Sequence, residues 1–148
     1  MVALRHVRDG REDHVDWLLA REDPPAGRLR SFRCRVSPIR ITEGAIGLRV
    51  MADHRPVYLE YQGPISGDRG RVERIATGRH RLVSGDPDGP GTLAMRWNAG
   101  EAAAGGVVLV RIDAVPPAGV VIAPPPPAEH PDEPVLWLHP EPPAGEAI

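Results

Sequence analysis

The stretch His14-Val15-Asp16-Trp17-Leu18-Leu19 has the alternation that is typical of a β-strand. Successive side chains of a strand point to opposite faces, so His14 and Asp16 share one face and the apolar residues between them pack on the other. An imidazole and a carboxylate then lie side by side, and such a pair can bind manganese, iron or zinc. The coordination shell needs at least one more side chain, for which His6 and His54 are the candidates. A solvent-facing histidine and aspartate on an amphipathic strand is the structural alternative.

The rest of the chain repeats this short alternating pattern. It has 148 residues, and 16 glycines and 18 prolines separate the alternating segments. We predict strands at residues 2–7, 14–20, 29–36, 47–51, 57–61, 70–75, 80–83, 92–97 and 107–112, and at most a helical turn near Glu43. Many short strands with little helix predict a mainly antiparallel all-β fold, a small closed or nearly closed β-barrel. A sandwich is the alternative.

The last quarter of the chain is dominated by proline. Prolines occur at 116, 117, 124–127, 131, 134, 140, 142 and 143, a density that we expect to prevent a sheet ladder. We therefore predict a barrel domain at residues 1–114 and a proline-rich tail at residues 115–148, in polyproline or disordered form. Residues 135–138 are the only part of it apolar enough to dock, most simply on the barrel itself. A chain that ends at Ala114 is then expected to fold.

Composition excludes several classes of protein. The formal net charge is −2 and the chain has no lysine, so any nucleic-acid site must be a local group of arginines. The single cysteine, Cys34, excludes an intramolecular disulfide and a cysteine-based zinc site, and its alternating context predicts a core position. We find no signal peptide and no apolar run of membrane-spanning length, so we expect no membrane contact, a cytoplasmic location and a monomer.

A second group of candidate residues lies in the middle of the chain. His54 precedes Tyr58 by four residues, and in an extended segment both side chains face the same way, so they could reach one ligand together. Three glycines follow within eight residues, at Gly63, Gly67 and Gly70, where they permit tight turns or close backbone approach.

Taken together, these residues resemble a known family. The order His6, then His14-x-Asp16, then Asp53-His54-x-Pro56-x-Tyr58 with the glycine segment behind it is similar to the 3′-phosphoesterase domain of bacterial DNA ligase D, and more closely to short stand-alone proteins built on that domain. The strand at residues 107–112 also looks like the late strand of the family. The resemblance covers roughly residues 2–113 and leaves the proline-rich segment out.

The resemblance implies a metal-dependent phosphoesterase. His6, His14 and Asp16 would hold Mn²⁺ or another divalent metal, while His54 and Tyr58 would contact the phosphate, with His54 a possible general acid. The catalytic set is then His54, Tyr58 and His14. The implied substrate is a nucleic-acid 3′ end that carries a phosphate or a ribonucleotide, within DNA repair, and DNA end-joining proteins are the implied protein partners.

The sequence departs from the family at Leu18. The ligase version has an arginine two residues beyond the motif aspartate, on the same strand face, and that arginine would help to bind phosphate. Its absence is expected to slow the reaction by roughly ten- to a hundredfold. Leu18→Arg is expected to raise the rate if the pocket has room for the longer side chain.

Two other functions use the same residues. A non-haem iron oxygenase would use a two-histidine, one-carboxylate triad, here His14 and Asp16 with His54 or His80. A catalytically weak or inactive module would keep the fold and bind nucleic-acid ends, and Leu18 is the feature that favours it.

Overall fold

A computed structural model describes residues 1–22, 24–98 and 106–141 of the chain. Its strands are β1 (Val2–Val7), β2 (His14–Leu19), β3 (Leu29–Cys34), β4 (Ala45–His54), β5 (Gly63–Pro64), β6 (Arg71–Gly85), β7 (Gly91–Trp97), β8 (Val108–Asp113), β9 (Val121–Ala123) and β10 (Val135–Pro140). Two short 3₁₀ helices, η1 (Pro38–Glu43) and η2 (Pro56–Leu59), are the only helices of the described part. The predicted all-β class with little helix is confirmed.

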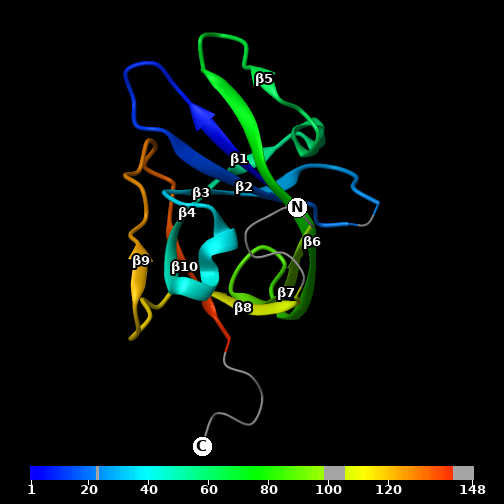
Figure 1. The fold of residues 1–148 in the computed structure, drawn as a ribbon, viewed down its shortest axis with the longest axis vertical. Helices are drawn as coiled ribbons and strands as arrows, with labels where there is room; N and C mark the ends of the chain where they lie inside the picture. The colour runs from blue at the N-terminus through cyan, green and yellow to red at the C-terminus, as the bar shows by residue number, and fades with distance from the viewer. Residues whose placement is uncertain (23, 99–105, 142–148) are drawn as a thin grey trace, which may run out of the picture.

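The described strands form one 10-stranded sheet that closes on itself. Its order is β1-β2-β3-β4-β10-β8-β7-β6, and β6 pairs back with β1 to complete the ring, so the molecule is a barrel and not a sandwich. β5 pairs with β6 outside this ring, and β9 pairs in parallel with β4 at the edge of the barrel (Figure 1). The ring pairings are antiparallel throughout.

β2 is buried on both faces, and this explains its composition. Val15, Trp17 and Leu19 point into the barrel, where they join the main core with Phe32 and Cys34 of β3. The core position predicted for Cys34 is therefore confirmed. The outward face of the same strand carries His14, Asp16 and Leu18, and all three are buried because other segments cover the barrel there.

A second, smaller core covers part of that outward face. It contains Val2, Leu4, Leu18, Leu29 and Val72, and the side chains of Tyr58, Leu59, Tyr61 and Ile65 pack on it from the excursion between β4 and β6. The side chains of β2 therefore alternate between two cores, one inside the barrel and one on its outer face.

The prediction that residues 115–148 cannot form a sheet ladder is wrong. β10 lies between β4 and β8, with Leu138 opposite Ile46 on one side and Ile112 on the other, so the barrel does not end at Ala114. Each described proline of this segment stands outside the ladder or at the last position of β10, where a missing N–H costs little. Pro142 and Pro143 lie outside the described residues.

The prolines between β9 and β10 form a covering segment. Residues 124–134, called the strap below, cross the outer face of β4, where Gly47 allows close approach because a Cβ there would lie 2.3 Å from the nitrogen of Pro125. Arg49 donates to the carbonyl oxygens of Pro126 at 2.7 Å and Glu133 at 3.0 Å. The strap is thus fastened to the barrel along its length.

Three other predicted elements differ in detail. Residues 57–61 form the helix η2 and a turn rather than a strand, since Pro56 begins a helical turn at its first position. The strands expected at 70–75 and 80–83 are one long strand, β6. No helix of the described part is long and apolar enough to span a membrane.

Candidate metal centre

The hairpin of β1 and β2 brings together the three residues that the sequence singles out as metal ligands. His6 stands directly opposite His14 in the β1–β2 register, and Asp16 follows His14 on the same strand face. Ligand atoms of the three side chains lie within 4.8 Å of one another. The separations are 3.2 Å between His6 Nδ1 and His14 Nε2, 2.8 Å between His14 Nε2 and Asp16 Oδ1, and 3.4 Å between His6 Nδ1 and Asp16 Oδ2.

His6 is oriented by the backbone of the glycine-containing loop. Its Nε2 lies 2.7 Å from the carbonyl oxygen of Arg69, and a carbonyl can only accept, so Nε2 carries the ring proton. The lone pair of the neutral ring is then on Nδ1, which faces His14 and Asp16. Metal-binding histidines generally donate their second nitrogen in this way. Gly70 allows the loop to come so close, because a Cβ there would lie 2.0 Å from the Val7 carbonyl oxygen.

His14 is held in a different tautomer. Arg8 Nη2 lies 3.2 Å from His14 Nδ1, and a guanidinium can only donate, so Nδ1 accepts and the proton of the neutral ring is on Nε2. That proton points at His6 Nδ1. A cation bound by both rings would replace it, and the His14 proton would move to Nδ1, which would break the contact with Arg8. Binding of a cation is thus linked to the position of Arg8.

Asp16 is the electrostatic centre of the cluster. It is 2 % exposed, and although burial by itself raises the pKa of a carboxyl, the hydrogen bonds and charges of His14 and His6 outweigh it and lower the Asp16 pKa. Burial lowers the pKa of His6, yet Asp16 and the Arg69 carbonyl reverse that effect and raise it. Asp16 Oδ1 is buried and makes no well-directed hydrogen bond in the described structure, although His14 Nε2 lies 2.8 Å from it. A buried anionic oxygen that is poorly served by hydrogen bonds fits a metal ligand.

The cluster lies at the floor of an open cavity of about 930 Å³. His54 and Tyr58 line the same cavity, with ring centroids 5.7 Å apart and nearly perpendicular planes. They approach each other because His54 ends β4 and Tyr58 lies on η2, and not because they share a strand face as predicted. Ser31 Oγ lies 2.8 Å from His54 Nδ1 and fixes that ring. Burial lowers the pKa of His54 below its ordinary value.

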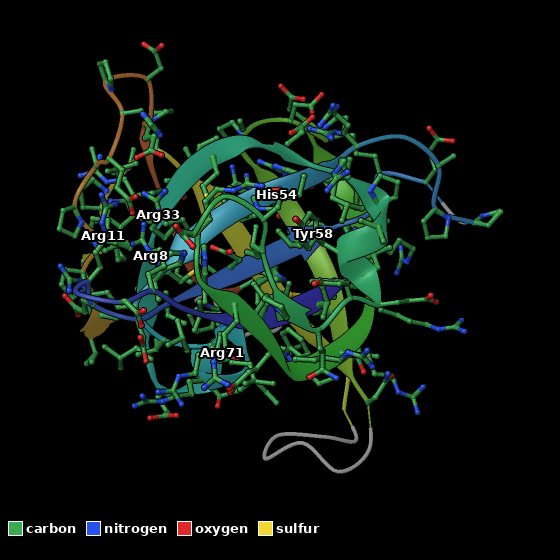
Figure 2. The ribbon with its side chains drawn as sticks, turned by 90° about the horizontal axis from the view of Figure 1, so that it is seen from above. Arg8, Arg11, Arg33, His54, Tyr58 and Arg71 are labelled. Carbon is green, nitrogen blue, oxygen red and sulfur yellow. The ribbon has the colours of Figure 1, made fainter. Side chains whose placement is uncertain are left out.

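Arginine and glutamate residues complete the wall opposite His54, and sequence reasoning missed most of them. Arg8, Arg11 and Arg33 lie together on one side of the view down the barrel, apart from His54 and Tyr58, whereas Arg71 lies elsewhere (Figure 2). Glu129 and Glu133 of the strap lie about a hundred or more positions from these arginines along the chain. Only the register Asp16↔Arg33 between β2 and β3 could have suggested Arg33. The two glutamates lie outside the nine strands predicted from sequence, and no sequence motif identifies them as part of the site.

His80 does not belong to this site. It lines a separate cavity of about 710 Å³ with Met1, Leu19 and Arg30. The described ligand cluster therefore consists of His6, His14 and Asp16, without His80.

The ion pair between Arg33 and Glu133 is buried, and it supports a stability prediction. Arg33 Nη1 and Nη2 lie 3.0 and 3.2 Å from the two carboxylate oxygens, and Glu133 Oε1 also accepts from the backbone N–H of Glu129 at 2.7 Å. Glu133→Gln leaves the guanidinium without its carboxylate, so we expect the free energy of unfolding to fall by about 3 kcal/mol. Urea unfolding measures this change in free energy. The control is Glu43→Gln, which breaks the exposed ion pair with Arg40 and should cost little.

The same variant should change the response to acid. Burial raises the pKa of Glu133, but Arg33 and the backbone N–H donors lower it overall, so the pair stabilises the fold above the ordinary carboxyl pKa of about 4.3 and loses this contribution as the pH falls toward the folded-state pKa. We therefore expect the stability difference between the wild type and Glu133→Gln to shrink below about pH 4. A difference that stays constant with pH would contradict the assignment.

Comparison with models of known protein families gives no match, and no curated protein is significantly similar to this chain. The geometry of the site therefore has to support the function by itself.

Proposed function

We propose that the protein is a metal-dependent phosphoesterase that processes the 3′ ends of DNA or RNA/DNA strands in repair. It would remove a 3′-phosphate or a 3′-ribonucleotide, with Mn²⁺ as the cofactor. The observation that carries the proposal is the convergence of His6, His14 and the buried Asp16 carboxylate at the floor of an arginine-lined cavity. Nucleic-acid 3′ ends and DNA end-joining proteins are the proposed partners, and the cytoplasm the proposed location.

The three side chains fit a divalent cation chemically. Two imidazoles and one carboxylate are ligands that manganese, iron and zinc accept, and the lowered Asp16 pKa keeps the carboxylate ionised at neutral pH. When bound, such an ion withdraws electron density from a phosphoryl oxygen and acidifies water. His6 is oriented for this by the Arg69 carbonyl, whereas His14 first has to move its proton away from the shared space.

His54 and Tyr58 would act on the phosphate itself. The phenol can donate a hydrogen bond to a non-bridging oxygen, and His54 can carry a proton to the leaving oxygen. Its lowered pKa makes the imidazole a weaker base and a stronger acid, and a bound phosphate dianion would favour the protonated ring again. Ser31 and the edge-on packing against Tyr58 hold the ring in place while the proton moves.

The oxygenase alternative receives less support from the geometry. His54 is bound to Ser31 and lies outside the cluster that could share one ion, and His80 lines the other cavity. The wall of arginines also suits a phosphate better than it suits a neutral organic substrate. The other alternative, a module that binds nucleic-acid ends without turnover, would use the same cavity. An assay of end processing distinguishes it from the enzyme.

The test is an assay of end processing with two variants. We expect the wild type to release phosphate or a ribonucleoside slowly from a labelled primer-template in the presence of manganese. His54→Ala should lower the rate by about a hundredfold or more. Asp16→Asn, which keeps the shape of the side chain, should weaken manganese binding in calorimetry by at least about a hundredfold. Asp13→Asn, which changes an exposed carboxylate paired with Arg5, is the control and should bind manganese normally.

Two results would decide against the proposal. Equal manganese affinity in the wild type and Asp16→Asn would remove the metal site. Binding of manganese and of DNA ends without any processing at high protein concentration would leave the end-binding module as the better account.

A further inference from the structure

Glu129 of the strap is held by the guanidinium groups of three arginines. Arg8 Nη1 and Nη2 donate to its two carboxylate oxygens at 2.7 and 2.9 Å, Arg11 Nη1 donates at 3.2 Å, and Arg33 Nε lies 3.3 Å away. Forked, charge-assisted contacts of this kind are the ones that arginine makes to carboxylates and phosphates alike. The arginines come from the β1–β2 loop and from β3, and Figure 2 shows them grouped at one side of the cavity.

The arginines retain donors that the carboxylate does not use. Arg8 Nε is buried without a hydrogen-bond acceptor in the described part of the chain, and Arg33 Nε, 3.3 Å from Glu129, makes no well-directed hydrogen bond there. The three guanidinium groups share the carboxylates of Glu129 and Glu133, and the next negative charge that acts on Arg8 is Asp16 of the candidate metal centre. A tetrahedral dianion has more oxygens and more charge than one carboxylate, and it would satisfy these donors better.

We propose that Arg8, Arg11 and Arg33 form an anion subsite for a phosphate group, and that Glu129 occupies this subsite until the phosphate displaces it. The subsite adjoins the metal centre because Arg8 also contacts His14. His54 and Tyr58 line the same cavity, but they lie apart from the three arginines in Figure 2, so the subsite is separate from them. That the phosphate belongs to a nucleic-acid strand rests on the proposed function, whereas binding of an anion does not.

The two glutamates of the strap differ in how firmly they are held. Glu133 is 8 % exposed and accepts from two backbone N–H groups of its own turn, so it is part of the fold. The Glu129 side chain is 24 % exposed and accepts only from arginines. Rotation of this one side chain would open the subsite, while Arg49 and Glu133 keep the strap on the barrel.

The experiment measures anion binding without metal. Wild type and Glu129→Gln are titrated with inorganic phosphate by calorimetry in buffer with EDTA, so that no turnover occurs. We expect Glu129→Gln to bind phosphate at least about tenfold more tightly, because the competing carboxylate charge is gone. Glu43→Gln, which removes the same charge at η1, should bind as the wild type does. Addition of Arg11→Gln to Glu129→Gln should remove most of the gain.

A second pair of variants covers the case that Glu129→Gln does not fold. The Arg11 side chain is 62 % exposed, so Arg11→Gln leaves the fold intact and should weaken phosphate binding to the wild type by several fold. Arg5→Gln, at an exposed arginine paired with Asp13, is its control and should have no effect. Equal affinity in all variants, or an equal rise in Glu43→Gln and Glu129→Gln, would overturn the proposal.

The source of the phosphate follows from a parallel titration. A short single-stranded DNA with a 3′-hydroxyl carries phosphodiesters only, so a gain of Glu129→Gln with this strand assigns the subsite to the nucleic-acid backbone. A gain with inorganic phosphate alone assigns it to free or terminal phosphate. If these gains occur but manganese-dependent processing does not, the subsite stands and the proposed activity fails. If processing occurs without any gain, the subsite fails and the activity stands.

Discussion

A chain that ends at Ala114 is expected not to fold. It would lack β10, which is the strand that joins β4 to β8, and the ring would open along two ladders. It would also lack Leu138, which is fully buried in the main core, and Glu133, the partner of Arg33. This reverses the expectation from sequence that the barrel is complete before residue 115.

The size of the effect follows from the marginal stability of small domains. Burial of one leucine side chain contributes about 1.5–3 kcal/mol, and loss of the Glu133 carboxylate costs about 3 kcal/mol or more. The exposed ladder edges of β4 and β8 add unpaired backbone groups. Together these losses are comparable with a total stability of about 5–15 kcal/mol, so no cooperative folded state should remain.

The measurement compares two shortened chains. Near-ultraviolet circular dichroism and urea unfolding should show no cooperative transition for the chain that ends at Ala114. A chain that ends at Glu141 keeps β10 and every described contact, and it should unfold as the full chain does. A cooperative transition of normal midpoint in the Ala114 chain would show that β10 is dispensable.

Leu18→Arg is expected to destabilise the protein rather than to restore a phosphate contact. Leu18 is 0 % exposed and packs in the outer core with Val2, Leu4 and Leu29, against which Tyr58 also packs. An arginine there would bury its charge among apolar side chains and overfill the core. We expect the free energy of unfolding to fall by about 3–5 kcal/mol. The faster end processing expected from sequence for Leu18→Arg requires space for the longer side chain, and this core has none.

The control for this prediction places the same side chain on the surface. Val83 stands on β6 and is exposed, so Val83→Arg should change the unfolding free energy by less than about 0.5 kcal/mol in the same urea titration. Leu18→Arg with wild-type stability and faster end processing would mean that the guanidinium reaches the cavity. The burial assignment of Leu18 would then be wrong.

The local pattern of the chain determined the class of the fold and the grouping of the three candidate metal ligands. Alternation in residues 2–7 and 14–19 places His6, His14 and Asp16 on outward strand faces, and a hairpin between the two strands brings them together. These conclusions need only the geometry of neighbouring peptides, which any short strand and tight connection share. Sequence reasoning was for this reason accurate about the β class, about the proximity of His6, His14 and Asp16, and about the core position of Cys34.

Only the tertiary structure decided which distant segments complete the barrel and the cavity. Glu129 meets Arg8 across 121 positions, and β10 enters the sheet between strands that are themselves far apart in sequence. The proline-rich strap has no local periodicity from which its partner strand could be predicted. Its position depends on long-range pairing and on Gly47, which has no Cβ and so allows Pro125 to approach β4 closely. Leu18 illustrates the same limit. Its strand face follows from alternation, but its burial depends on Tyr58 and Tyr61, which pack over it from another part of the chain.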